Sequence, residues 1–269
     1  FGVTPGRALT RFRSALGDSH RGGRSVVRLE FGDTIVVYKP RSVAAEAGFA
    51  RCIEWFNACS GELPLLAAEV IDRGHYGWCR FVEARPVPDA AAAARFFRRQ
   101  GMYLALFNAL CTTDLHHENL IAHGEHPVYI DLETLLHARL DGEGEQHGER
   151  AAGERAPFTI ADTFLLPGAT LRGGGGKSAD LSPLGADEAF DWPLPVDTTE
   201  AANTDEMRIV RGSASAHAEG HRPRLEGRLT VAAEHLDELR RGFRAAYRVL
   251  LRERSGLKAG AETWFAHVP

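Results

Sequence analysis

Two short runs near the start of the chain, residues 26–31 and 34–39, are rich in β-branched and apolar residues. Gly32 and Asp33 lie between the runs, and such a pair favours a tight turn between antiparallel strands. The pattern therefore predicts a β-hairpin close to the N-terminus.

A helix is expected directly after this hairpin, over residues 44–59, because large apolar side chains recur there at helical spacing. These side chains are Phe49, Ile53 and Phe56. We expect this apolar face to pack on the hairpin's sheet. A second hairpin is predicted at residues 68–72 and 78–83, closed by Pro86 and Pro88.

The pattern becomes helical from Asp89 onward, where a long helix is predicted to continue as far as Asp114. Its apolar positions are Phe96, Tyr103, Leu104, Phe107 and Leu110. A short hairpin is predicted next, at residues 120–122 and 128–130. Residues 231–254 then have the single apolar stripe of an amphipathic helix.

The succession of elements predicts an α+β protein with two lobes. An antiparallel, β-rich small lobe is expected at residues 1–88 and a mostly helical large lobe at residues 89–269. Residues 139–156 and the glycine run 173–176 contain few apolar side chains, and we expect both segments to be mobile.

Composition narrows the class of protein. The formal net charge of −4 argues against a general nucleic-acid surface. No apolar run reaches the roughly 18–20 residues of a membrane span, and no signal-peptide pattern is present, so we expect a cytoplasmic protein. The chain begins at Phe1 rather than Met, which suggests a piece of a longer protein. The cysteines form no C-x-x-C pair, which favours buried, reduced thiols at Cys52, Cys59, Cys79 and Cys111.

Asp114, Asn119 and Asp131 have the spacing by which kinases build their base and metal site. In that chemistry one carboxylate orients the attacking hydroxyl, a role that suits Asp114, while Asn119 and Asp131 suit Mg²⁺. Taken singly, each aspartate is more often a turn cap or a strand end. Their combination, with His116 two residues after Asp114, favours phosphoryl transfer.

Lys39 lies at the end of the second run, where kinases place the lysine that contacts the nucleotide phosphates. The alternative is a solvated lysine on an edge strand. An acidic partner is expected on the following helix, where Glu46 and Glu54 are both available. Few of the 32 basic residues are lysines, which makes the choice informative: Lys39, Lys177 and Lys258.

A phosphate-covering loop is predicted just before the first strand. Residues 17–20 read Gly-Asp-Ser-His and precede the first predicted strand, so Asp18 and His20 could act there, although the same sequence is an ordinary turn. The later glycine run is not a P-loop, because Leu171 occupies the position of the first required glycine. A zinc site is a weak alternative, based on His116, His117, His123 and His126.

Together these segments resemble the dehydratase domain of class II lanthipeptide synthetases, whose core resembles lipid kinases. The resemblance spans residues 17–250. It is carried by Gly17-Asp18-Ser19-His20, Val37-Tyr38-Lys39-Pro40-Arg41, Asp114-Leu115-His116-His117-Glu118-Asn119, Ile130-Asp131-Leu132-Glu133, Leu165-Leu166-Pro167, Asp180-Leu181-Ser182, Thr204-Asp205-Glu206-Met207 and Gly242-Phe243-Arg244.

The resemblance implies a bilobal, protein/lipid-kinase-like fold and a cytoplasmic phosphotransferase that uses ATP and Mg²⁺. Its substrate would be a ribosomal precursor peptide, leader plus core, whose Ser and Thr hydroxyls are phosphorylated before elimination to dehydroalanine or dehydrobutyrine. By position, the catalytic residues would be Asp114, His116, Asp18 and His20; the nucleotide would be bound by Lys39, Arg41 and Glu54; and the metal by Asn119, Asp131 and Glu133.

Two departures limit what the resemblance implies. Dehydratase domains of this family are longer, and we expect the residues that support elimination, and a zinc cyclase domain, on a part of the protein outside this sequence. Two other functions remain open. One is a small-molecule kinase of the aminoglycoside type, and the other is an inactive, peptide-binding kinase relative.

Overall fold

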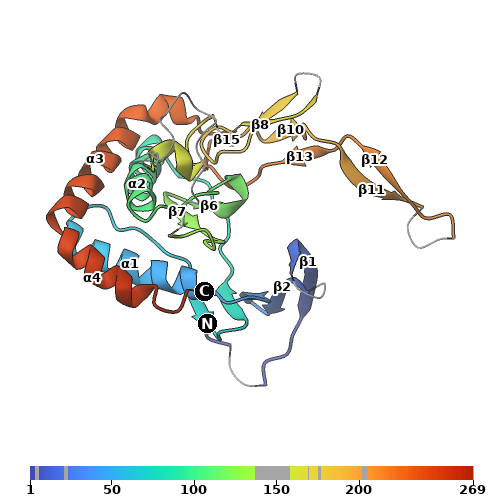
Figure 1. The fold of residues 1–269 in the computed structure, drawn as a ribbon, viewed down its shortest axis with the longest axis horizontal. Coiled ribbons are helices and arrows are strands. Elements are labelled where there is room, and N and C mark those ends of the chain that lie inside the picture. The colour runs from blue at the N-terminus through green and yellow to red at the C-terminus, as the bar shows by residue number, and fades with distance from the viewer. Residues whose placement is uncertain are drawn as a thin grey trace, which may run out of the picture.

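The computed structural model describes residues 1–3, 6–20, 24–136, 158–168, 170–174, 177–201 and 205–268. The predicted mobile segment 139–156, and residues 175–176 of the glycine run, lie outside these ranges. No helix in the described ranges is long and apolar enough to cross a membrane. Figure 1 shows a body of helices and short strands, with the N-terminal sheet beside it and a thin β-arm extending away.

The N-terminal sheet is antiparallel, with strand order β1-β2-β3-β5-β4. The predicted first hairpin is confirmed, and Gly32 adopts the left-handed φ of 61° that its turn requires. The second hairpin is also confirmed, although its strands are shorter than predicted. The five strands are β1 (Arg11–His20), β2 (Arg24–Phe31), β3 (Thr34–Lys39), β4 (Val70–Asp72) and β5 (Gly77–Arg80).

Strand β1 corrects the sequence analysis. Residues 17–20 were expected to form a loop before the first strand, but their backbone extends β1, and His20 pairs with Arg24 of β2. The register shifts twice along β1, between Arg13 and Leu16 and between Leu16 and His20. Such irregular pairing hides the two-residue alternation by which a strand is recognised in a sequence.

Helix α1 (Ala44–Ser60) follows β3, as predicted, and ends at Gly61, whose φ of 65° is the left-handed conformation common at helix C-termini. Its buried face contacts β4 but packs mainly into the helical body rather than across the sheet. The Phe49 ring stacks on the Phe107 ring with centroids 5.1 Å apart. The small sheet is therefore joined to the body through α1.

Helix α2 (Ala90–Ala109) is the centre of the hydrophobic core. Its last three turns are almost entirely buried, including Tyr103 and Phe107. Helix α3 (Leu236–Arg252), preceded by the 3₁₀ turn η4 (Ala232–His235), packs along α2 and confirms the predicted C-terminal helix. Helix α4 (Arg254–Trp264) was not predicted. It packs on α1, where the Trp55 and Trp264 rings lie 5.5 Å apart.

Asp89 caps the N-terminus of α2, because its Oδ1 accepts a hydrogen bond of 2.7 Å from the backbone N–H of Ala92. We expect Asp89→Ala to lower the free energy of unfolding by about 1 kcal/mol, since the helix loses a partner for one of its free N–H groups. Urea unfolding followed by circular dichroism measures this change. Asp89→Asn keeps the acceptor and should cost much less; equal losses in the two variants would contradict the capping role.

Between α2 and α3 the chain is richer in strands than predicted. The described residues form five two-stranded antiparallel sheets there. The predicted hairpin is β6 (Leu120–His123) with β7 (His126–Tyr129). The unpredicted pairs are β8 (Thr170–Arg172) with β9 (Ser178–Asp180), β10 (Ala189–Asp191) with β13 (Ser215–His217), β11 (Val196–Glu200) with β12 (Arg208–Gly212), and β14 (Arg224–Leu225) with β15 (Arg228–Leu229).

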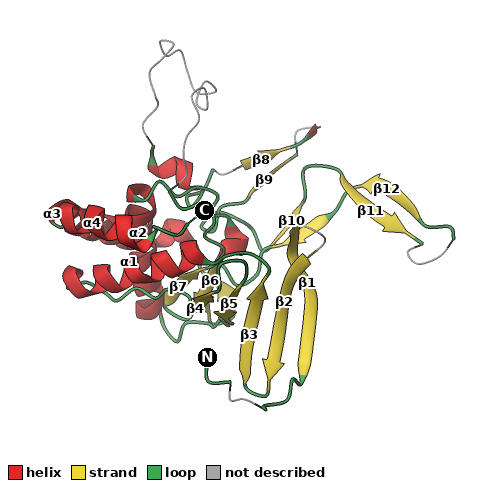
Figure 2. Cartoon of the chain, turned by 60° about the horizontal axis from the view of Figure 1, so that its bottom comes forward, coloured by secondary structure: helices red, strands yellow, loops and turns green. Residues whose placement is uncertain are grey.

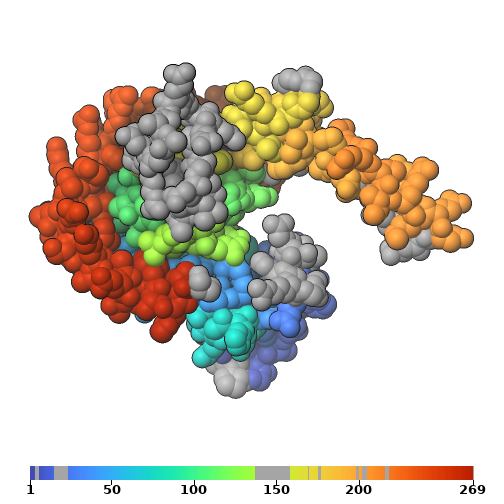
Figure 3. All heavy atoms as spheres, viewed as in Figure 1, coloured from blue at the N-terminus to red at the C-terminus, as the bar shows by residue number. Residues whose placement is uncertain are grey.

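The β8–β9 hairpin includes part of the glycine run that we expected to be mobile. The Gly173 N–H donates a 2.9 Å hydrogen bond to the carbonyl oxygen of Lys177, and β8 and β9 pair on either side of these residues. The β11–β12 hairpin forms the arm that extends from the body in Figure 3. Figure 2 shows the N-terminal sheet and this arm on the same side of the helical body.

Candidate active site

Lys39 and Glu46 form a buried ion pair at the end of β3, the central strand of the N-terminal sheet. Lys39 is the last residue of β3 and Glu46 lies in the first turn of α1. Lys39 Nζ lies 3.2 Å from Glu46 Oε1, and the two residues are only 7% and 3% exposed. A buried charge is costly unless it is paired, so these two side chains determine each other's position.

The start of α1 is held in place by Asp72 at the end of β4. Its Oδ1 accepts hydrogen bonds from the Val43 N–H at 2.8 Å and from the Ser42 hydroxyl at 2.9 Å. A carboxylate at a helix N-terminus is also favoured by the helix dipole. The sheet therefore determines where the first turn of α1, and with it Glu46, lies.

Asp131 approaches this ion pair from the other part of the chain. It follows β7 and adopts a left-handed φ of 60°, a conformation that Asp tolerates better than most residues. Lys39 Nζ lies 3.1 Å from Asp131 Oδ1. Lys39 thus bridges Glu46 and Asp131, residues far apart in the sequence.

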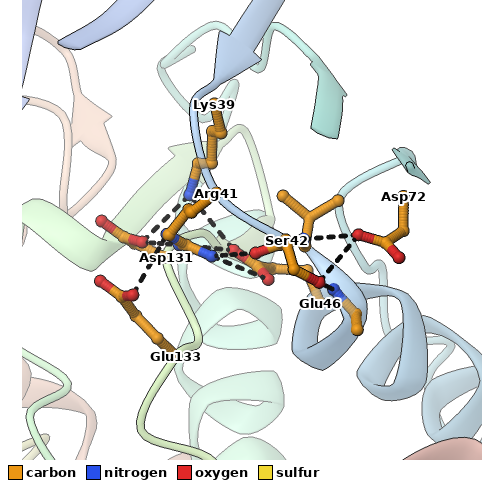
Figure 4. A network of polar contacts seen from close by, with 9 residues as sticks. Lys39, Arg41, Ser42, Glu46, Asp72, Asp131 and Glu133 are labelled. Atoms are coloured by element: carbon orange, nitrogen blue, oxygen red, sulfur yellow. Dashed lines mark hydrogen bonds and ion pairs between the residues drawn. The ribbon is translucent and has the colours of Figure 1, made fainter. Parts of the chain in front are cut away.

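Arg41 joins the same cluster and brings in a third carboxylate. Its guanidinium lies 2.9 Å from Glu46 Oε1 and 3.2 Å from Glu133 Oε2, and it also contacts Asp131 Oδ1. Figure 4 shows Lys39 and Arg41 between Glu46 on one side and Asp131 and Glu133 on the other. We call these five residues the charge cluster.

Neighbouring charges in this cluster favour the ionised forms of Asp131 and Arg41. Burial raises the pKa of Asp131, but Lys39 and Arg41 lower it by more, so the net shift is downward. Burial lowers the pKa of Arg41, but Glu46, Asp131 and Glu133 raise it above its ordinary value. At neutral pH Asp131 is therefore a carboxylate, the form that binds a metal cation.

The segment from Asp114 to Asn119 lies beside this cluster and is fixed by main-chain contacts. Asp114 is exposed, with a left-handed φ of 58°. The buried side chain of Asn119 donates a 2.9 Å hydrogen bond to the Asp114 carbonyl oxygen, and the Asn119 carbonyl oxygen accepts one of 2.9 Å from the Ile130 N–H. Asn119 therefore links Asp114 to the residue that precedes Asp131.

The adjacent histidines have different environments. His116 is partly exposed and precedes the short 3₁₀ turn η1 (His117–Asn119). His117 is buried; its N–H donates to the Leu181 carbonyl oxygen at 2.9 Å, and its Nδ1 lies 3.1 Å from the same oxygen. Burial lowers the pKa of His117, which favours the neutral ring. The sequence did not predict that His117 anchors this segment, although His117 lies within the Asp114–Asn119 motif.

The predicted metal ligands suit Mg²⁺ better than zinc. Arg41 contacts both Asp131 and Glu133, and the Asn119 carbonyl oxygen accepts a hydrogen bond from the N–H of Ile130, the residue before Asp131. Two carboxylates and an amide are hard oxygen ligands, and Mg²⁺ in nucleotide enzymes completes its shell with water and phosphate oxygens. Within the described residues no group of three or more His, Cys, Asp or Glu side chains is placed to hold a metal ion.

One of the predicted site residues is not brought to this cluster. Glu54 is exposed on α1, eight residues beyond Glu46 and about 12 Å further along the helix, so its assignment to the nucleotide site is wrong and Glu46 is the partner of Lys39. The side chains of Asp18 and His20 lie outside the described part of the structure, although their backbone belongs to β1.

The cysteines are consistent with the predicted reduced thiols. All four are free; Cys52 and Cys79 are buried as predicted, whereas Cys59 and Cys111 are only partly buried. Burial raises the pKa of the Cys52 thiol to about 12 and that of Cys79 to about 11. Thiols with such values are not activated as nucleophiles, so the chemistry of the site depends on its carboxylates, cations and histidines.

Comparison with known proteins gives two matches. Over 249 residues the chain is 22% identical to a protein of Lactococcus lactis subsp. lactis described as "Lacticin 481/lactococcin biosynthesis protein LcnDR2". The aligned region covers 88% of this chain but only 27% of that protein. A family model described as "Domain of unknown function (DUF4135)" matches residues 1–267, nearly the whole sequence. The chain therefore belongs to the DUF4135 family.

Proposed function

We propose that this chain is the kinase core of a lanthipeptide-forming enzyme, a phosphotransferase that uses ATP and Mg²⁺ to phosphorylate Ser and Thr side chains of a ribosomal precursor peptide. The observation that carries the proposal is the contact of Lys39 with both Glu46 and Asp131. In protein kinases a strand lysine pairs with a glutamate of the following helix, and a metal-binding aspartate must be in place at the same time.

The arrangement of elements supports a kinase-like, bilobal fold. The lysine lies at the end of the third strand of a five-stranded antiparallel sheet, and the glutamate lies on the helix that follows. Asp131 comes from a hairpin in the second part of the chain and meets the lysine where the two parts join. A nucleotide bound at this junction would contact groups from both lobes.

Each residue then has a chemical role. Lys39 would contact the nucleotide phosphates, and Asn119, Asp131 and Glu133 would hold Mg²⁺, which would supply positive charge to the phosphate oxygens. Asp114, exposed and held by Asn119, accepts the proton of the substrate hydroxyl as that oxygen forms its bond to the γ-phosphorus. The bond between the γ-phosphorus and the bridging oxygen breaks, and ADP leaves. His116 lies two residues after Asp114 and is partly exposed, so we assign it to the same phosphoryl-transfer site.

The relative's name supports a peptide rather than a small molecule as substrate. The relative is described as a lacticin 481/lactococcin biosynthesis protein, and the motifs of this chain resemble those of lanthipeptide synthetases, whose substrates are ribosomal precursor peptides. We therefore propose that phosphorylation is the first half of a dehydration, with the precursor's leader and core as binding partners. A small-molecule kinase of the aminoglycoside type remains the second candidate, favoured by the shared Asp114-to-Asn119 spacing.

Mass spectrometry tests the proposal. The protein is incubated with ATP, Mg²⁺ and the precursor peptide of its own gene neighbourhood, and in parallel with kanamycin. We expect a gain of about 80 Da per modified Ser or Thr, the mass of a transferred phosphoryl group. Phosphorylation of kanamycin alone would support the small-molecule kinase. A peptide that binds but gains no mass would identify an inactive, peptide-binding relative.

A further inference from the structure

Arg41 makes contacts that a nucleotide-binding cation does not need. Its guanidinium, in a side chain only 14% exposed, contacts Glu46, Asp131 and Glu133 together, and Nη1 also donates to the Ser42 carbonyl oxygen at 2.8 Å. A planar guanidinium can serve several acceptors at once, whereas an ammonium acts as a point charge. The side chain is thus held over the two carboxylates assigned to the metal.

The net charge of the cluster determines how these contacts affect metal binding. Lys39 and Arg41 supply two positive charges against three carboxylates in the charge cluster. A divalent cation on Asp131 and Glu133 would reverse that balance and would lie close to the guanidinium, whose positive charge would repel it. It would also bind the two carboxylates that Arg41 contacts through Asp131 Oδ1 and Glu133 Oε2. Arg41 and the metal therefore compete for the same two carboxylates.

We propose that Arg41 is a competing counter-cation, which gives up Asp131 and Glu133 only when the divalent metal arrives together with phosphates that can accept the guanidinium. The inference rests on the proposed function for the identity of the metal site. It makes metal binding conditional on nucleotide, because the metal alone must displace Arg41 with no anion to receive it. Arg41 then selects the metal–nucleotide complex over the free metal.

Titration with Mn²⁺ in the absence of nucleotide tests this competition, with the free ion counted by electron paramagnetic resonance. We expect Arg41→Met to bind Mn²⁺ about tenfold more tightly than the unaltered protein, in line with the coupling of close charge pairs. Arg80→Met is the matched control, because Arg80 pairs with Glu69 on the sheet and not with the charge cluster. Its Mn²⁺ affinity should not change.

Two further variants make the result specific. Adding Asp131→Asn to Arg41→Met should remove the tenfold gain, because the gained site is the released carboxylate. Arg41→Gln repeats the test with a polar side chain if Arg41→Met does not fold, as judged by circular dichroism. Equal or weaker Mn²⁺ binding in the folded Arg41 variants, or a gain that survives Asp131→Asn, would overturn the proposal.

The two proposals fail in different ways. If the unaltered protein phosphorylates its peptide but Arg41→Met binds Mn²⁺ no better, only the competition is wrong. If Mn²⁺ binding tightens as expected but no substrate gains a phosphate, the counter-cation role stands as a property of the metal site, and the phosphotransferase is wrong.

Discussion

Asp131→Asn is expected to lower the rate of phosphate transfer to the precursor peptide by about a thousandfold or more, the scale on which phosphoryl transfer depends on its charge-neutralising groups. The amide has the shape of the carboxylate but no charge to hold Mg²⁺ or to pair with Lys39 and Arg41. The rate is measured as the gain of about 80 Da per site with time.

The fold should survive this substitution. The Asp131 side chain is 43% exposed, and Lys39 keeps its buried partner Glu46. Asp191→Asn is a matched control, because Asp191 is an exposed aspartate of β10 whose Oδ1 accepts a 3.3 Å hydrogen bond from the Ser215 hydroxyl, and it does not belong to the charge cluster. A transfer rate in folded Asp131→Asn within tenfold of the Asp191→Asn rate would refute the metal site.

The N-terminal sheet was largely predictable because the residues that specify its first hairpin are neighbours in the sequence. The Gly32 turn and the two runs that flank it specify a hairpin without reference to the rest of the chain. Lys39 could be singled out for the same reason, since its position at the strand end follows from the hairpin. Strand β1 was missed because its register shifts break the alternation on which such predictions depend.

The choice between Glu46 and Glu54 could not be made from the sequence. Both lie on the predicted helix, and helical spacing alone does not say which end of the helix meets the sheet. The structure decides it through Asp72, which fixes the first turn of α1 against the end of β4. This contact joins residues about thirty positions apart, so no short pattern records it.

The site's finer geometry depends on contacts of the same long-range kind. The motif that contains Arg41 could be recognised, but the contact of Arg41 with Glu133 joins residues that are far apart in the sequence. The strands between α2 and α3 are only two to five residues long, too short for a periodicity to be detected. Left-handed backbone at Asp114 and Asp131 is set by the surrounding structure, not by residue type alone.

The contact between α2 and α3 depends on two glycines that the sequence gives no local reason to expect in a helix. A Cβ added to Gly101 would lie 1.9 Å from the carbonyl oxygen of Leu239, and one added to Gly242 would lie 1.8 Å from that of Arg98. Glycine lowers helix stability by about 1 kcal/mol relative to alanine. The close approach of the two backbones therefore requires glycine despite its cost.

Gly101→Ala should therefore lower the free energy of unfolding by about 3 kcal/mol or more, because the methyl group forces the two helices apart and opens the core around them. Urea unfolding followed by circular dichroism at the helix band measures the loss, and Gly242→Ala provides an independent test of the same contact. Gly256→Ala in α4 is the control, since its Cβ would meet Trp55 at an ordinary 3.4 Å. There the gain in helix propensity should leave stability equal or slightly higher. If Gly101→Ala and Gly256→Ala were equally stable, the helices would not be held at the distance that the glycines permit, and α3 would not be fixed against the helix that leads to Asp114.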